Sequence, residues 1–268
     1  MTVGRAGIIR VADSDAPDLK VGPTRMLIWG INPVIEALRA KRVKRVRVAA
    51  RSDKRVDEAL ALAHQQRVPV EKVDPQTLDR ASNGGVHQGI VAELEALHDY
   101  SVQELVTAAS PEAPLVVVLD GVEDPHNLGA VLRTVDAAGA HGVVRQARHA
   151  AAIDGIAAKA SAGAVSYVKI ATVVNIARAL EELKDANVWT VGLAGEASEP
   201  YDTVDFTLPT ALVVGAEGEG LRRLTRDRCD RLVHIPMRGE VSSLNVSVAT
   251  GIALFEAARQ RRRRSGTM

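Results

Sequence analysis

The feature that most limits the possible folds is an uninterrupted apolar run at residues 115–119, Leu-Val-Val-Val-Leu. A strand with one solvated face alternates apolar and polar residues, whereas an unbroken run is typical of a strand buried on both faces of a parallel sheet. Helical patterns separate further short apolar runs near residues 142–144, 167–171, 188–193, 211–215 and 232–235. This alternation predicts an α/β domain whose helices cover both faces of a mostly parallel sheet.

The chain ahead of this run predicts a smaller α/β unit. Residues 1–24 lack periodicity and are expected to form a flexible leader, while residues 25–96 carry alternating strand and helix patterns. Residues 97–113 are weakly patterned and contain a Ser-Pro pair, which predicts a linker. The larger domain then occupies residues 114–268.

Composition excludes several classes of protein. Hydrophobic residues make up 46% of the 268 residues and aromatic residues only 3%, so the core must be aliphatic. A net charge of +1 excludes a uniformly basic surface but permits a basic face for nucleic acid. The single cysteine, Cys229, excludes a disulfide framework, and the seven histidines lack paired metal-ligand spacing. The histidine spacing leads us to expect no bound metal. Because the chain has neither an apolar run of membrane-spanning length nor a signal peptide, it is also expected to be soluble and cytoplasmic.

Three loops that follow predicted strands carry chemically suggestive residues. The first, residues 120–134, contains an Asp-Pro turn, then Asn127, a candidate helix cap, and Arg133. Arg133 comes six residues after Asn127, a spacing that we interpret as bringing both side chains toward one side of a helix. The alternative for Arg133 is an ordinary solvated helix charge.

The second loop, residues 215–220, reads Gly-Ala-Glu-Gly-Glu-Gly. Its glycines would let the backbone approach a ligand closely, although a simple tight turn is the alternative. No Lys-Ser/Thr pair follows, and the loop is not at the position of a dinucleotide fingerprint, which disfavours a nucleotide-dependent dehydrogenase. Glu217 and Glu219 would repel phosphate, so a positively charged ligand, or one bound through the backbone, fits better.

The third loop precedes the last helix. Four hydrogen-bonding side chains lie at the start of this helix, which suggests either a site or simple helix capping; they are Ser242, Ser243, Asn245 and Ser247. The carboxyl ends of parallel strands meet at one edge of a sheet, so the three loops together predict one ligand site.

In this order, the three loops resemble the signature motifs of the SpoU (TrmH) class of SPOUT RNA 2′-O-ribose methyltransferases. The motifs are residues 124–134, 215–220 and 235–247, and residues 30–34 and 87–90 resemble the substrate-binding domain of the same class. The resemblance therefore extends from about residue 26 nearly to the C-terminus. Within the class the chain is most similar to the RlmB type, which methylates a guanosine 2′-hydroxyl in 23S rRNA.

The resemblance implies a trefoil-knotted α/β domain that uses S-adenosylmethionine as methyl donor and ribosomal RNA as substrate. It also implies a homodimer packed through the C-terminal helix, where Val248, Ile252 and Phe255 form an apolar stripe that core packing could equally explain. The alternatives are 2′-O-methylation of another rRNA or tRNA nucleotide, and a non-catalytic RNA-binding protein on the same fold.

The resemblance also assigns residues. Arg133 is implied as the base that deprotonates the ribose hydroxyl, although a guanidinium holds its proton up to about pH 12, so an RNA phosphate is expected to assist. The implied catalytic residues are Arg133, Asn127, Glu217, Ser243 and Asn245. The implied cofactor-binding residues are Leu193, Ala194, Gly195, Gly215, Glu217, Gly220, Ile235, Met237, Ser243 and Leu244.

Two stretches leave open questions. Residues 144–149 replace a Pro-Lys/Arg pattern expected from the class, and we expect this segment to face RNA. The four arginines at 261–264 could bind RNA phosphates or form a solvated chain end.

Overall fold

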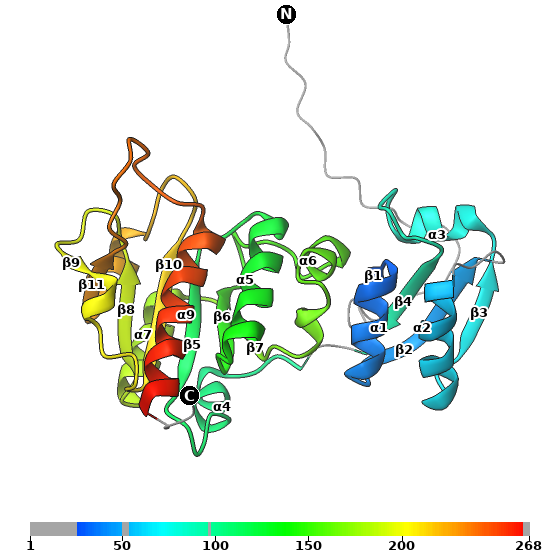
Figure 1. Cartoon of the computed structure of the whole chain (residues 1–268), viewed down its shortest axis with the longest axis horizontal. Helices are drawn as coiled ribbons and strands as arrows, with labels where there is room; N and C mark the ends of the chain where they lie inside the picture. The colour runs from blue at the N-terminus through cyan, green and yellow to red at the C-terminus, as the bar shows by residue number, and fades with distance from the viewer. Residues whose placement is uncertain (1–25, 50–53, 96–97, 265–268) are drawn as a thin grey trace, which may run out of the picture.

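The computed structural model describes residues 26–49, 54–95 and 98–264, which form two α/β units lying side by side (Figure 1). The larger unit is built on a seven-stranded sheet in which every neighbouring pair is parallel. Across the sheet the strands are β7 (Ile170–Val173), β6 (Gly142–Gln146), β5 (Leu115–Asp120), β10 (Thr210–Gly215), β8 (Trp189–Leu193), β11 (Arg231–His234) and β9 (Glu199–Pro200). The predicted mostly parallel α/β architecture is confirmed.

Strand β5 explains why the apolar run lacks alternation. Leu115, Val117 and Leu119 belong to the core formed with helices α5 (Pro125–Ala138) and α9 (Val246–Arg264). Val116 and Val118 belong to the core on the opposite face, formed with α4 (Val102–Thr107) and α7 (Ile176–Asp185). All six residues of β5 are buried, so both sets of side chains are removed from water.

Several short elements are not evident from the sequence pattern. The weakly patterned segment 97–113 contains α4, which begins with a capping box between Ser101 and Glu104 and buries Val102 and Leu105. Six residues give too few helical repeats for a periodicity signal. The other short elements of the larger unit are α6 (Gly155–Ala160), α8 (Arg223–Arg228) and the 3₁₀ turns η1 (Ala164–Ser166) and η2 (Tyr201–Thr203).

The smaller unit is a four-stranded sheet with the order β1 (Leu27–Trp29), β4 (Ile90–Leu94), β2 (Val43–Ala49) and β3 (Val70–Val73). Its helices are α1 (Ile31–Arg39), α2 (Lys54–Gln65) and α3 (Pro75–Ala81). In the described ranges of both units, none of the helices has the length and apolar character needed to cross a bilayer.

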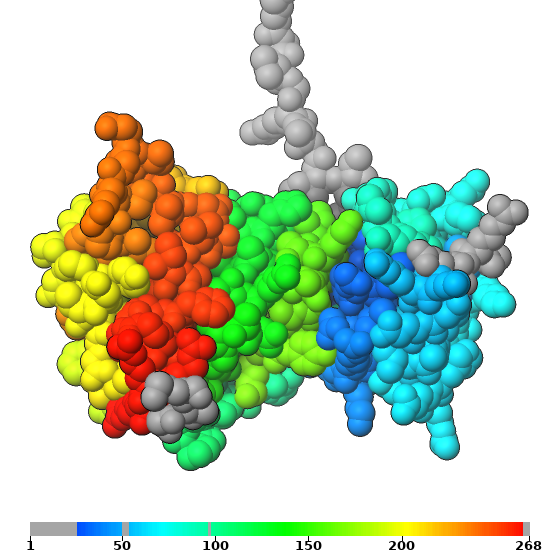
Figure 2. Space-filling view, in the orientation of Figure 1, coloured from blue at the N-terminus to red at the C-terminus, as the bar shows by residue number. Residues whose placement is uncertain are grey.

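The two units meet at α6 and the turn that follows it (Figure 2). The ring of Trp29 lies directly over Gly155, where an added Cβ would be only 1.9 Å from the ring atom Cζ3. The hydroxyl of Tyr167 donates a 2.9 Å hydrogen bond to the Glu36 carboxylate, and burial together with this bond raises the pKa of Tyr167 to about 12. A close-packed contact with a specific polar bond holds the smaller unit against the larger one.

Candidate active site

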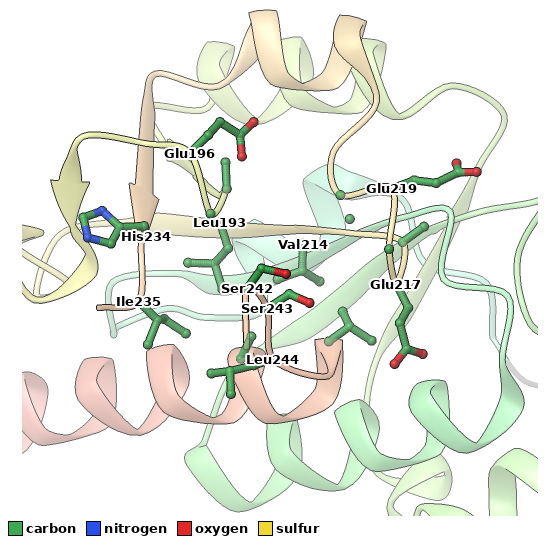
Figure 3. Close-up of a pocket in the computed structure, with 18 of the residues that line it drawn as sticks. Leu193, Glu196, Val214, Glu217, Glu219, His234, Ile235, Ser242, Ser243 and Leu244 are labelled. Carbon is green, nitrogen blue, oxygen red and sulfur yellow. The ribbon is translucent and has the colours of Figure 1, made fainter. Parts of the chain in front are cut away.

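A cavity of about 420 Å³ lies at the carboxyl edge of β8, β10 and β11, where the second and third sequence loops meet. Figure 3 shows Leu193 and Ile235 on one side of this cavity, Glu217 and Glu219 on the other, and the 242–244 segment between them. All ten residues predicted to bind a cofactor line it: Leu193, Ala194, Gly195, Gly215, Glu217, Gly220, Ile235, Met237, Ser243 and Leu244.

The glycine loop is folded back on itself at the cavity wall. The backbone N–H of Ala216 donates to the carbonyl of Gly220 at 3.1 Å, and the N–H of Gly220 donates back to Ala216 at 2.9 Å. Gly220 has a φ of +69°, a conformation that costs glycine little. At Gly215 an added Cβ would be 2.0 Å from the carbonyl carbon of Gly220, so no other residue fits without moving the loop. This compact turn leaves backbone at the cavity surface.

Three polar side chains from three different loops converge beside this cavity. The Asn127 amide donates to Glu217 Oε2 at 3.1 Å, and the Asn245 amide donates to Asn127 Oδ1 at 2.9 Å. Asn245 also lies 3.5 Å from Glu217 Oε1, which closes the triangle. Asn127 is buried, so its orientation is fixed by packing as well as by these bonds. We call Asn127, Glu217 and Asn245 the polar triangle.

The first loop differs from its prediction. Asn127 does not cap α5, because the cap is Asp124, whose carboxylate accepts from the N–H of His126 at 2.9 Å. Asn127 lies within the first turn of α5, where its side chain is free to bond Glu217. The Asp-Pro turn thus positions Asn127 in the first turn of the helix.

The third loop combines capping with site formation, as its excess of polar residues suggested. Asn245 Oδ1 accepts from both the backbone N–H and the hydroxyl of Ser247, at 2.9 and 2.6 Å, at the start of α9. The amide nitrogen of the same side chain bonds Asn127. Ser242 and Ser243 instead line the cavity.

Arg133 is not part of the polar triangle. Six residues of α-helix place it about 9 Å farther along the axis than Asn127 and about 240° around it. The predicted shared side was therefore wrong, since Asn127 is buried and Arg133 is exposed. No hydrogen bond or ion pair joins its guanidinium to any other side chain in the described ranges. The next residue, Thr134, lies 3.6 Å from the Cβ position of Gly251, so Arg133 is on the part of α5 that packs against the first half of α9.

Two other expectations concerned basic segments. Within residues 144–149, Val144 and Arg145 are buried, and burial lowers the pKa of Arg145, so this part of the segment does not face RNA. At the C-terminal run, Arg261 is half-buried and donates to backbone carbonyls. Arg261 is a structural residue, neither a phosphate ligand nor a solvated end.

Sequence reasoning missed a third group, formed by Asp120, Gln146 and Arg222. Arg222 Nη1 donates to Gln146 Oε1 at 2.6 Å, and its backbone N–H donates to Asp120 Oδ2 at 2.9 Å. These residues are 76 and 102 positions apart from Arg222, and no local pattern indicates such a contact. Across the ranges that the structure covers, no group of three His, Cys, Asp or Glu side chains gathers as metal ligands.

Comparisons with known proteins agree with this geometry. Residues 114–255 match the SpoU rRNA Methylase family, and residues 27–100 match the RNA 2′-O ribose methyltransferase substrate binding family. The chain is 46% identical over 239 residues to 23S rRNA (guanosine-2′-O-)-methyltransferase RlmB of Haemophilus influenzae, covering 87% of this chain and 97% of that one. It is 45% identical over 240 residues to the Escherichia coli K12 protein of the same name, covering 88% and 98%.

Solved structures give the same result. The SpoU methyltransferase AviRb from Streptomyces viridochromogenes, in complex with AdoMet, superposes with a TM-score of 0.76 at 28% identity and covers 89% of this chain and 91% of its own. An AdoMet-bound rRNA methyltransferase from Sinorhizobium meliloti superposes with a TM-score of 0.70 at 27% identity, covering 88% and 87%. The chain belongs to the SpoU rRNA methylase family. The family and the enzyme class predicted from the three loops, RNA 2′-O-ribose methyltransferase, are confirmed.

Proposed function

We propose that this protein transfers a methyl group from S-adenosylmethionine to the 2′-hydroxyl of a guanosine in 23S rRNA. One observation carries the reaction: a polar triangle of two amides and a carboxylate borders a glycine-walled cavity. The guanosine and the 23S rRNA come from the relatives that match nearly the whole chain.

The cavity suits the proposed cofactor. Leu193, Ile235 and Leu244 offer apolar surface for an adenine ring, and the turn after Gly215 offers backbone groups at close range. Glu217 and Glu219 give the wall a negative charge, which favours a sulfonium over a phosphate. When bound, S-adenosylmethionine supplies an activated methyl group that a ribose oxygen can attack. The residues present fit that group.

The polar triangle would orient the ribose. A ribose hydroxyl is a weak nucleophile, so the protein must place its oxygen accurately and accept its proton. Asn127 and Asn245 hold the Glu217 carboxylate in one orientation, and Glu217 also lines the cavity. These contacts support the proposal that this carboxylate holds a hydroxyl at the cavity mouth. Ser243, on the same wall, would contact cofactor or ribose.

Arg133 is proposed to bind an RNA phosphate and to assist deprotonation. Its exposed guanidinium, without an internal partner in the described ranges, is free to make charge-assisted bonds with phosphate. A guanidinium alone is a poor base, so the phosphate that it binds would accept or relay the proton.

A homodimer is part of the same proposal. Val248 and Phe255 are 49% and 48% exposed, and with Ile252 they form a stripe on the outer side of α9, not in the core. Helices α9 and α5 pack side by side on one face of the molecule (Figure 2). A second copy that covered this face would also cover the region where Arg133 emerges. The expected place of action is the cytoplasm, where ribosomal RNA is found.

The knotted chain path implied by the family resemblance also remains a proposal. Its support is local: the segment after β11 returns across the end of β8, so that the backbone oxygen of Ser242 lies 4.0 Å from the Cβ position of Gly195. The chain then continues into α9.

The decisive test compares 2′-O-methylation along rRNA from cells with and without the protein. We expect one 23S guanosine to lose its ribose methyl group, whereas loss of a base methyl group would contradict the reaction. RNA binding by the purified protein without methyl transfer would instead support the non-catalytic alternative.

Arg133 and the dimer are tested with variants. Arg133→Lys should lose most activity, and Arg178→Lys, at an exposed arginine on α7, is the control. Full methylation by Arg133→Lys at neutral pH would contradict a specific role for the guanidinium.

Phe255→Glu should yield a monomer in light scattering, whereas Leu208→Glu, at a site 41% exposed, should not.

A further inference from the structure

A second hollow, of about 300 Å³, lies at the carboxyl ends of β5, β6 and β7, outside the cofactor cavity. Its rim carries two exposed apolar side chains, Val174 at 86% and Leu224 at 59% exposure. Its polar lining includes Asp120, Gln146 and Arg222, together with Asn175, Arg223 and Thr225. Apolar walls around a small set of polar groups are the usual composition of a site for a flat heterocycle.

This hollow shares a lining residue with a hollow beside the proposed ribose position. That third hollow, of about 250 Å³, is lined by residues that include Asn127, Glu217 and Arg222. Arg222 therefore borders both hollows, and Asn127 and Glu217 belong to the polar triangle. If the ribose to be methylated lies at the polar triangle, a base at or next to the methylated position can reach the second hollow by passing Arg222.

Asp120 is an unusual group in this hollow. Its side chain is 1% exposed, yet Oδ1 accepts no hydrogen bond within the part of the chain that the structure describes. Arg222 Nη1 lies 3.7 Å from Oδ1, an ion-pair distance that is too long for a hydrogen bond. Since buried polar atoms are nearly always paired, an unpaired carboxylate oxygen in a residue that lines the hollow points to a ligand that donates an N–H.

Arg222 supplies the complementary chemistry. Of its five N–H donors, one bonds Gln146, and the guanidinium is held over Gly121, where an added Cβ would lie 3.1 Å from Nη2. The remaining donors are available to carbonyl or ring-nitrogen acceptors. The hollow therefore offers an acceptor-only oxygen beside a fixed set of donors.

Among RNA components, guanine matches this pattern best. Its N1–H and N2 amino groups are donors that suit a carboxylate, and its O6 and N7 are acceptors that suit an arginine. Adenine and cytosine present an unprotonated ring nitrogen on the same edge, and uracil offers one N–H donor where guanine offers its N1–H and its amino group. We propose that the hollow between Val174 and Leu224 is a guanine-reading subsite for the RNA substrate.

This proposal rests on the proposed function, and it leaves two sources for the guanine. The base belongs either to the methylated nucleotide or to a guanosine next to it. Both share the chemistry above, so the experiment uses two modified RNAs, each with inosine in place of one guanosine. Inosine keeps N1–H and O6 but lacks the N2 amino group.

Methyl transfer is measured on a 23S rRNA fragment that contains the mapped guanosine. We expect inosine at one of the two places to lower kcat/KM of the unmodified protein about 10-fold, mostly through KM. The place that responds identifies the source of the base. Equal rates on guanosine and both inosine RNAs would overturn the subsite, whereas no methylation of the guanosine RNA at all would overturn the proposed function instead.

The variant Asp120→Asn tests the carboxylate itself. Asparagine can still accept from the Arg222 backbone N–H while it presents an amide N–H₂ where Oδ1 lies, so the preference for guanosine should fall from about 10-fold to near equality. A purely structural role would lower both rates and preserve the ratio, and that outcome would contradict the proposal. S-adenosylmethionine binding, measured separately, reports whether the cofactor cavity remains intact.

Leu224→Ser provides a second test that leaves the buried groups untouched. The loss of one apolar wall should raise KM for RNA several-fold with kcat unchanged. Leu208→Ser, at the opposite end of the sheet, is the matched control and should leave KM unchanged. Equal KM values for both variants would contradict a base bound between the two apolar walls.

Discussion

The two ends of the seven-stranded sheet treat their polar groups differently. At the amino end, Arg261 donates to the backbone oxygens of Ala113, Pro114, Phe206 and Leu208, and His141 Nδ1 accepts from the N–H of Leu115. At the carboxyl end, glycine turns leave a cavity, and Asp120 Oδ1 and His234 Nδ1 are buried without a hydrogen-bond partner in the described ranges. These two amino-end side chains are hydrogen-bonded within the protein, whereas these two carboxyl-end atoms are not.

This difference separates structural from functional polar residues more reliably than residue type. Arg261 and Arg133 are both arginines near an apolar helix face. The guanidinium of Arg261 donates its hydrogen bonds to backbone carbonyls, whereas that of Arg133 has no partner in the described ranges. Open hydrogen-bonding capacity costs stability, so its concentration at one end of the sheet indicates where ligands bind. Substitutions at the carboxyl end should therefore affect binding or rate, and those at the amino end should affect stability.

The largest effect is expected at the polar triangle. Asn245→Asp keeps the shape but replaces the amide that donates to Asn127 with an oxygen, and it adds a negative charge near Glu217. We expect kcat to fall about 100- to 1000-fold, as for loss of one preorganised donor. Steady-state methylation at saturating RNA measures kcat, and single-turnover methylation with the enzyme in excess over RNA isolates the transfer step.

Two further measurements delimit that result. Thermal unfolding and S-adenosylmethionine affinity should stay close to those of the unmodified protein, because Asn245 does not line the cavity. A cofactor affinity that fell as steeply as kcat would mean that the triangle supports the cavity and does not act on the ribose.

Sequence reasoning succeeded at the carboxyl end for a physical reason. A cavity made from backbone requires glycines at fixed places, and the turn at 215–220 and the polar loop before α9 are both local patterns. It failed where the outcome depended on long-range contacts: the bonds of Arg261, and the contacts of Arg222 with Asp120 and Gln146. The prediction that Arg133 shares a side of α5 with Asn127 was also wrong. A spacing of six residues is less than two full turns, which take about seven.

The cofactor wall offers the next test. Gly215→Ala places a Cβ 2.0 Å from the Gly220 carbonyl carbon and must displace the loop backbone. S-adenosylmethionine affinity should fall about 100-fold, equivalent to about 2.7 kcal/mol, in titration calorimetry. Gly239→Ala, where an added Cβ meets nothing within 4 Å, is the matched control. Unchanged affinity for both variants would mean that the loop does not contact the cofactor.

Substitutions at the amino end of the sheet are expected to change the free energy of unfolding and not the rate of methyl transfer. Arg261→Ala removes a side chain that bonds four carbonyls, and should lower the free energy of unfolding by about 2 kcal/mol. Methyl transfer by the folded variant should be unchanged. Arg263→Ala removes the same charge from an exposed position, so it should change neither the free energy of unfolding nor methyl transfer. Weaker RNA binding by Arg261→Ala at full stability would instead support the phosphate-binding alternative for the C-terminal arginines.

His141 gives the smallest effect and tests the amino end by pH. Burial, and then the charge of Arg261, lower the pKa of His141 below its ordinary 6.5. In the folded protein the neutral ring accepts a hydrogen bond from the N–H of Leu115. The unfolded chain therefore binds the proton more readily, and this contribution to stability is complete above about pH 6.5 and is lost as the pH falls through the folded-state pKa. His141→Asn keeps an acceptor but does not titrate, so its unfolding free energy should fall less steeply between about pH 6.5 and 5, by less than about 1 kcal/mol. Identical slopes for the unmodified protein and His141→Asn in denaturant titrations would show that His141 is not held neutral by the fold.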